Sequence, residues 1–378
     1  MFGVGLHFSL EDLLRVRRIA VPGALVQIVA ATGMGMVPAL LWGWPWGQAL
    51  VFGLCLSVAS TVVLLKALES RHWLGTSPGN IAVGWLVVED LVMVLVLVLL
   101  PPLAAVLGGA APAPGATALP LWQTVLLTLF KVSAFIALML GAGRRLLPWL
   151  LMWVARTGSR ELFILTTVVL AISVAYLAGQ VFGVSFALGA FFAGMVLRES
   201  EFSHQAAEET LPLRDAFAVL FFVAVGMLFD PAILLKAPDQ VLLVVAVIML
   251  GKTLAAAALV LLMRYPLRTA LVVSVSLAQI GEFSFILAGL AMNLKLLTPA
   301  GQNLILAGAL VSIALNSVLF ALVEPLQQQL TRRFHCAQRL EQRPDPLAAL
   351  PDSVAQEYLT DVVIVAGYGR VGQLLVPE

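Results

Sequence analysis

The sequence predicts an all-α polytopic membrane protein, and two observations carry this prediction. Hydrophobic residues make up 61% of the 378 residues and charged residues only 11%, whereas soluble domains carry about 25% charged residues. Apolar stretches long enough to cross a hydrocarbon core as helices recur from Ile19 to Phe320. Such a composition excludes a soluble globular protein.

Hydropathy predicts ten membrane-spanning helices, at 19–41, 48–66, 80–100, 121–142, 161–178, 185–197, 212–229, 240–263, 267–293 and 301–323. The loops at 11–18, 66–79, 143–160, 198–214 and 264–268 hold thirteen Lys or Arg residues, and the opposite loops hold only Lys236 and Lys295. Because basic loops stay on the cytoplasmic side, the chain after Glu324 is expected in the cytoplasm.

Both ends of the chain suggest that it is part of a longer protein. The run Phe2–Leu6 is apolar, too short to span, and reads as the end of a helix that begins earlier. We therefore divide the chain into a transmembrane domain at 1–324, a polar cytoplasmic linker at 325–360 and the start of a further domain at 361–378.

The last segment carries a glycine motif of nucleotide-binding domains. A predicted strand at 361–366 runs into Gly367, Gly369 and Gly372, the Gly-x-Gly-x-x-Gly turn that brings a backbone close to a pyrophosphate. The acidic ribose contact expected about 20 residues further on is absent, because the chain ends first. We expect no cofactor in this chain, and NAD(H) or an adenine nucleotide only in a complete domain.

Ionisable residues inside apolar spans are costly and usually functional. Glu89 and Asp90 lie near the middle of the third span, Lys252 in the eighth, and Glu282 in the ninth. Lys131 also falls within a span, but contact with the interface or with a neighbouring helix explains it better than a role in transport.

Small and polar residues at the middle of the second and ninth spans predict two broken helices. They are Ser57, Ser60 and Thr61 in one span and Gln279, Gly281 and Glu282 in the other. Ordinary close helix packing would explain either segment alone. However, spans one to three and eight to ten run in opposite directions, as in an inverted repeat whose broken helices bind ions.

Several motifs in order resemble the monovalent cation:proton antiporter-2 family, and within it the Kef-type proteins. They are Gly53-Leu-Cys-Leu-Ser-Val-Ala-Ser-Thr-Val-Val-Leu-Leu-Lys-Ala-Leu-Glu69, Val87-Val-Glu-Asp-Leu91, Gly183-Val-Ser-Phe-Ala-Leu-Gly-Ala-Phe-Phe-Ala-Gly-Met195, Leu220-Phe-Phe-Val-Ala-Val-Gly-Met-Leu-Phe-Asp230 and Ala278-Gln-Ile-Gly-Glu-Phe283. The resemblance covers nearly the whole chain and implies the NhaA-type fold, in which a core domain with two crossed, unwound helices moves against a dimerisation domain. It implies proton-coupled antiport of K⁺ or Na⁺ by a homodimer in the bacterial inner membrane. It also implies missing N-terminal helices and a truncated RCK-type nucleotide-binding domain beginning at Gly367.

The same resemblance implies roles for particular residues. Asp90 matches the family's ion- and proton-carrying aspartate, and Lys252 matches the lysine that pairs with it in some members. Residues 57–61 and 279–282 match the unwound segments. Glu89 occupies a position that varies among relatives, so it either carries an extra proton or pairs elsewhere.

Other functions fit the sequence less well. Gly367-Tyr-Gly369 is similar to a K⁺-channel filter, but it follows a polar linker instead of lying between spans. A carrier for organic anions, or an inactive fragment, stays open. We expect no enzyme, no metal site and no nucleic-acid partner, since His7, His72, His204 and His335 are scattered without metal or catalytic spacing.

Overall fold

A computed structural model describes residues 2–7, 10–109, 121–184, 186–198, 200 and 203–345, and these residues form helices and turns without any strand. The helices are α1 (Phe2–His7), α2 (Leu10–Leu41), α3 (Trp46–Ser57), α4 (Thr61–Glu69), α5 (Ser77–Leu103), α6 (Leu121–Leu138), α7 (Arg144–Ala155), α8 (Arg160–Phe182), α9 (Phe186–Arg198), α10 (Ser203–Met227), α11 (Ile233–Lys236), α12 (Pro238–Ala246), α13 (Lys252–Leu262), α14 (Leu267–Ser276), α15 (Glu282–Asn293), α16 (Pro299–Arg333) and α17 (His335–Glu341). Two π-helical turns, η1 (Met139–Gly143) and η2 (Val247–Gly251), join α6 to α7 and α12 to α13.

Seven segments of the described chain are long and apolar enough to cross a membrane. They are Leu14–Leu41, Trp46–Glu69, Ser77–Leu103, Leu126–Ala155, Arg160–Phe182, Pro238–Leu262 and Pro299–Arg333. Large apolar side chains also cover the outer surface, with Leu41 81% and Leu262 78% exposed. The prediction of an all-helical, multi-pass membrane protein is confirmed.

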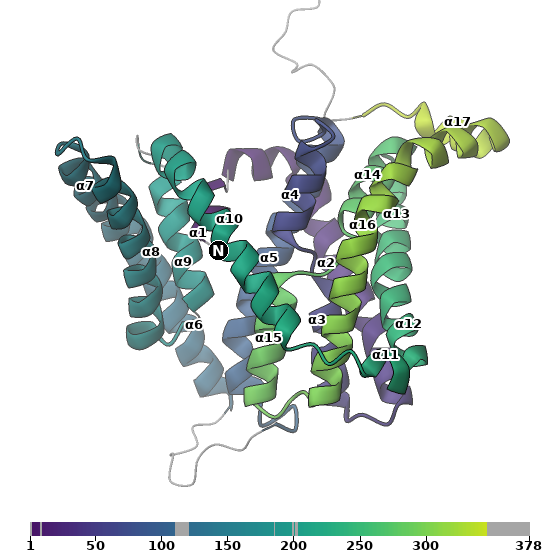
Figure 1. The fold of residues 1–378 in the computed structure, drawn as a ribbon, viewed down its shortest axis with the longest axis horizontal. Coiled ribbons are helices and arrows are strands. Elements are labelled where there is room, and N and C mark those ends of the chain that lie inside the picture. The colour runs from purple at the N-terminus through teal and green to yellow at the C-terminus, as the bar shows by residue number, and fades with distance from the viewer. Residues whose placement is uncertain are drawn as a thin grey trace, which may run out of the picture.

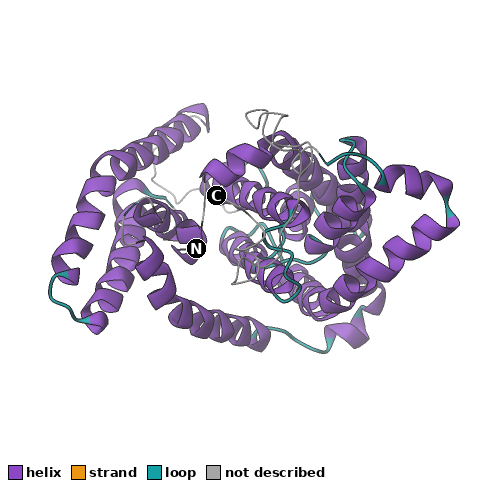
Figure 2. Ribbon diagram, turned by 90° about the horizontal axis from the view of Figure 1, so that it is seen from above, coloured by secondary structure: helices purple, strands orange, loops and turns teal. Residues whose placement is uncertain are grey.

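The helices form two groups (Figures 1 and 2). One group packs α1, α6, α7, α8 and α9 together, and α10 contacts it before running toward α11. The other group contains α2–α5 and α12–α16, and its helices contact one another extensively. Among the described helices, only α5 with α6 and α10 with α16 make substantial contacts between the groups.

Two helices of the second group begin with the same type of N-cap. The hydroxyl of Thr76 accepts a hydrogen bond from Gly79 N at 3.3 Å, and that of Thr298 accepts one from Gly301 N at 3.1 Å. A threonine that caps a backbone N–H, followed by proline in the first turn, is a strong signal for the beginning of a helix. These caps fix where α5 and α16 enter the bundle.

Several segments predicted as loops are helical. The predicted loop at 143–160 is mostly α7, which continues from α6 through η1; the predicted loop at 11–18 lies wholly within α2, and α10 begins within the predicted loop at 198–214. The predicted linker at 325–360 is helical as far as Glu341, with one interruption at Phe334. In each case charged residues ended the hydropathy signal, although long basic side chains are compatible with a helix that continues to the interface. The glycine motif at 367–372 lies outside the described residues.

Candidate functional site

Two helices of the second group are interrupted. The chain leaves α3 at Ser57 and is extended at Val58 and Ser60 before α4 begins. It leaves α14 at Ser276 and is extended at Gly281, where α15 begins. Each interruption frees backbone groups that a continuous helix would pair internally.

The two interruptions are joined by reciprocal hydrogen bonds. Ser60 N donates to Gln279 Oε1 at 2.9 Å, and Gln279 Nε2 donates to Ser60 O at 3.1 Å. The side chain of Gln279 thus gives Ser60 N a partner that the interrupted helix does not supply, and it adds a second donor to Ser60 O, which already accepts from Leu64 N at 3.1 Å. Because both residues are buried, this joint satisfies polar groups that solvent does not reach.

Gly281 lets the two segments approach closely. A Cβ atom on Gly281 would lie 2.4 Å from both Cα and Cβ of Ser60, well inside contact distance. The Ser60 hydroxyl donates to Glu282 Oε2 at 3.1 Å and accepts from Val63 N at 3.4 Å, which caps α4. One serine therefore connects the start of α4 with the start of α15.

The two carboxylates of α5 accept hydrogen bonds from the middle of the α3–α4 interruption and from the first residue of α4. Glu89 Oε2 accepts from Ala59 N at 2.9 Å, and Asp90 Oδ2 accepts from Thr61 Oγ1 at 3.0 Å. Both residues are buried, and among the described residues Glu89 Oε1 and Asp90 Oδ1 have no hydrogen-bond partner. The Trp85 side chain also interacts with Glu89. An acceptor oxygen left unpaired in a buried site is costly, so Asp90 Oδ1 above all marks a position for a proton or a cation.

Lys252 reaches the same place from α13. It is fully buried, and its Nζ donates to Gln279 O at 3.1 Å. Its electrostatic partner is Glu89, whereas Asp90 interacts with Glu282 and Glu89. Within the described residues no ion pair closer than 4.0 Å links Lys252 to either carboxylate of α5. The expected direct pair with Asp90 is therefore replaced here by a contact to the interrupted backbone.

The site carries more negative than positive groups. Glu89, Asp90 and Glu282 supply three carboxylates around one ammonium, that of Lys252. Glu282 is half-buried, whereas the other three are buried. Such an excess of carboxylates in a low-dielectric setting attracts cations and repels anions.

One polar residue of the site was missed in the sequence. Gln27 of α2 is fully buried, and its Nε2 donates to Ser57 O at 3.2 Å. Gln27 is neutral and lies outside the two predicted broken segments, so neither the buried charges nor the helix breaks pointed to it. The signal was a glutamine in the middle of an otherwise apolar span. Ser57 contributes its carbonyl, because its hydroxyl turns back to Leu54 O at 2.8 Å.

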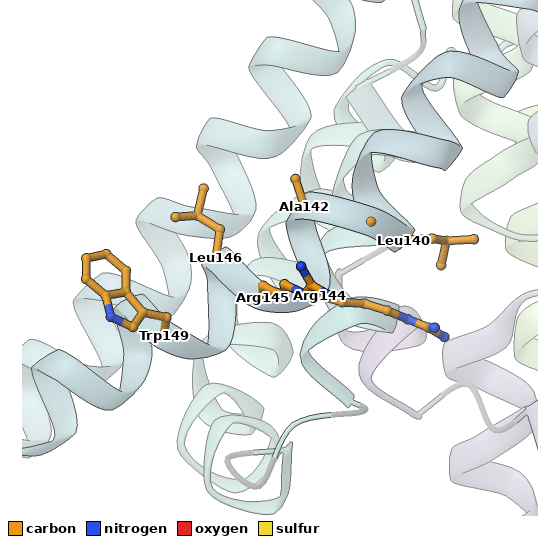
Figure 3. Close-up of a pocket in the computed structure, with 7 residues that line it drawn as sticks. Leu140, Ala142, Arg144, Arg145, Leu146 and Trp149 are labelled. Atoms are coloured by element: carbon orange, nitrogen blue, oxygen red, sulfur yellow. The ribbon is translucent and has the colours of Figure 1, made fainter.

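The remaining candidates lie elsewhere. Lys131 is exposed on α6, and the described residues contain no group of three His, Cys, Asp or Glu side chains that could hold a metal ion. A concavity of about 980 Å³ surrounds η1 and shares no residue with the interruptions (Figure 3). Figure 3 shows Leu146 and Trp149 on one side of Arg144 and Arg145, and Leu140 on the other.

Comparisons with known proteins show the family of the chain. Residues 1–324 match the family described as sodium/hydrogen exchanger, transmembrane. The YbaL protein of Escherichia coli (strain K12), provisionally named a cation/proton antiporter, is 55% identical over 375 residues, which cover 99% of this chain and 65% of YbaL.

More distant relatives carry potassium-efflux names. K(+) efflux antiporter 4 of Arabidopsis thaliana is 33% identical over 329 residues, covering 85% of this chain and 53% of that protein. The glutathione-regulated potassium-efflux system protein KefC of Shigella flexneri serotype 5b (strain 8401) is 28% identical over 379 residues, covering 99% of this chain and 56% of that protein. These relatives are named as transporters and not as enzymes, and this chain spans between about half and two thirds of their length. The chain belongs to the sodium/hydrogen exchanger family of membrane transporters.

Proposed function

We propose that this protein exchanges a monovalent cation, K⁺ or Na⁺, for protons across the bacterial inner membrane. The observation that carries the proposal is the pair of buried carboxylates on α5. Each accepts a hydrogen bond from the interrupted chain on one oxygen, and Asp90 Oδ1 has no hydrogen-bond partner within the part of the chain that the structure describes. A carboxylate in this position holds either a proton or a cation, and competition between the two couples their transport.

Asp90 is the exchanging group in this proposal. Its bound oxygen is fixed by Thr61, and its free oxygen is available for a proton or a cation. Lys252 and Glu89 set the charge around it. The joint between Ser60 and Gln279 holds the two interrupted helices together, with Gly281 and Glu282 beside it. Ser57 and Thr61 lie at the two ends of the first interruption. Glu89 decides whether one or two protons move for each cation.

Alternating access requires the site to face each side of the membrane in turn. The limited contact between the two helix groups supports a movement of the α2–α5 and α12–α16 group against the other. In that second group the units α2–α5 and α12–α16 each contain one interrupted helix and end on a threonine-capped helix. This correspondence supports an inverted repeat, in which rocking about the joint exposes the site to opposite sides.

Selectivity between K⁺ and Na⁺ stays open in the proposal. The names of the plant and Shigella relatives favour K⁺, and the family name favours Na⁺. The alternative of an organic-anion carrier is disfavoured by the excess of carboxylates, which would repel an anionic substrate. We further propose a homodimer, a cytoplasmic C-terminal tail, and a nucleotide-binding domain that begins at the glycine motif.

The test is exchange in proteoliposomes that contain the complete gene product. With an imposed pH gradient, adding K⁺ or Na⁺ outside should collapse the gradient, as read by a pH-sensitive dye. Asp90→Asn should abolish the exchange, although an amide oxygen still accepts from Thr61. Asp239→Asn, the same substitution at an exposed position of α12, should leave it intact. Full exchange by a well-folded Asp90→Asn variant would show that Asp90 only holds helices together.

Glu89→Gln separates the two possible roles of the second carboxylate. If Glu89 carries a proton, the variant should move one proton fewer for each cation, and its exchange should respond differently to the membrane potential. If Glu89 only holds Ala59 N, the variant should keep the proton-to-cation ratio, because a glutamine oxygen accepts the same hydrogen bond.

A further inference from the structure

We propose that Gln27 is a positioning residue of the ion site, holding the interrupted segment 57–59 against Glu89. This inference rests on the proposed antiport and extends it to a neutral side chain on a helix that carries no charged member of the site. The contact that carries it is the hydrogen bond from Gln27 Nε2 to Ser57 O at 3.2 Å, in which both residues are fully buried.

The contact satisfies a group that the helix leaves unpaired. Ser57 is the last residue of α3, and the chain is extended immediately after it, so its carbonyl lacks the usual helical donor. A flipped amide would bring Gln27 Oε1 against the Ser57 carbonyl oxygen, so the donor at this contact is Nε2. Removing the amide leaves a buried carbonyl without a partner, which is the costly outcome.

Gln27 and Glu89 reach the interrupted segment from two neighbouring helices. Helix α2, which carries Gln27, packs against both α3 and α5, and α5 carries Glu89. The hydrogen bonds of the two side chains end two residues apart in the chain, at Ser57 O and Ala59 N.

The interrupted segment lies between these two side chains. Gln27 holds its first residue through Ser57 O, and Glu89 holds its third residue through Ala59 N at 2.9 Å. A displacement of Ser57 is transmitted through Val58 to the N–H that binds Glu89. Gln27 consequently controls the geometry of a carboxylate that it does not itself need to touch.

Lys252 makes the corresponding hydrogen bond to the backbone of the other interruption, between α14 and α15. Its Nζ donates to Gln279 O, as Gln27 Nε2 donates to Ser57 O, and the helices that carry the two residues pack against each other. One interrupted backbone is thus held by a charged donor and the other by a neutral one. The neutral donor leaves the charge of the site unchanged and adds an unpaired buried acceptor, Gln27 Oε1.

The experiment compares Gln27→Met, Gln27→Glu and the matched control Thr32→Val in proteoliposomes. Thr32 lies on the same helix, is buried, and its hydroxyl has no hydrogen-bond partner among the described residues. For Gln27→Met we expect an apparent KM for the cation raised about tenfold with a smaller change in maximal rate, which corresponds to about 1.4 kcal/mol. Thr32→Val should match the wild type in both quantities.

Gln27→Glu gives a pH-dependent readout. When protonated, the acid donates to Ser57 O as the amide does; when ionised, it donates nothing and adds a negative charge beside Glu89. Exchange should be near wild type at acidic pH and fall toward alkaline pH, narrowing the pH profile. This result also decides the question if Gln27→Met fails to fold.

The outcomes separate the inference from the proposed function. If the Gln27 variants lose thermal stability but keep the wild-type KM and pH profile, Gln27 is only a packing residue and the inference is wrong. If the wild-type protein itself shows no cation-dependent proton movement, the antiport proposal fails instead.

Discussion

Gly281 provides the sharpest test of the joint between the interrupted helices. Its φ of −141° lies in the extended region that other residues adopt, so Gly281→Ala introduces no backbone strain. The added Cβ would lie 2.4 Å from Ser60 Cα and Cβ. Carbon atoms in contact are about 3.5 Å apart, so the two segments must separate by about 1 Å.

That separation breaks the joint. The bonds Ser60 N to Gln279 Oε1, at 2.9 Å, and Gln279 Nε2 to Ser60 O, at 3.1 Å, would lengthen beyond the range of a hydrogen bond. Two buried hydrogen bonds contribute about 2 kcal/mol in total, which agrees with the cost of overpacking by one methyl group. If this energy is lost from the ion-binding state, the apparent affinity for the cation should fall about 30-fold.

The measurement is the cation dependence of exchange in proteoliposomes. Gly289→Ala is the matched control, because Gly289 lies on the same helix α15 and nothing lies within 4 Å of the added atom. The control should exchange like the wild type. An unchanged affinity in Gly281→Ala would refute the reasoning and show that the segments can part without affecting the site.

Three further predictions concern charge, topology and the tail. Lys252→Ala should move the pH profile of exchange to higher pH or impair transport without unfolding the protein, because a lost positive charge makes the nearby Glu89 harder to ionise; Lys131→Ala, at an exposed position, should change neither. A periplasm-active reporter fused after Phe334 should be silent and one fused near Gly115 active, and the reverse result would contradict the cytoplasmic tail. The purified chain should bind no NAD(H), AMP or ATP in calorimetry, and saturable micromolar binding would show that the glycine turn at 367–372 acts alone.

The fold class could be predicted because membrane composition is a strong signal. Apolar stretches and the few charges within them identified most spans and the residues Glu89, Asp90 and Lys252. The ends of helices were harder to predict from the sequence, since hydropathy falls at a charged residue whether or not the helix ends there. Arg144 and Arg145 illustrate this, as they lie at the start of α7 and do not end the helical segment.

The hydrogen-bond partners of the site residues could not be predicted from the spacing of residues in the sequence. Adjacent helical residues point about 100° apart, so Glu89 and Asp90 bind different residues, Ala59 and Thr61. The π-helical turn η2 immediately precedes Lys252, and its i→i+5 hydrogen bonds shift the register of the residues that follow. A hydropathy pattern records neither this turn nor the contact of Lys252 with Gln279 O.

The reciprocal bonds between Ser60 and Gln279 also constrain how this protein can change over generations. The two residues are separated by 219 positions in the chain, yet each supplies the partner of the other. A recombination event that joins the first half of one relative to the second half of another separates these two hydrogen-bonded partners. Functional chimeras should therefore come from relatives whose two interrupted segments already match, and exchange of one segment alone should require compensating change in the other.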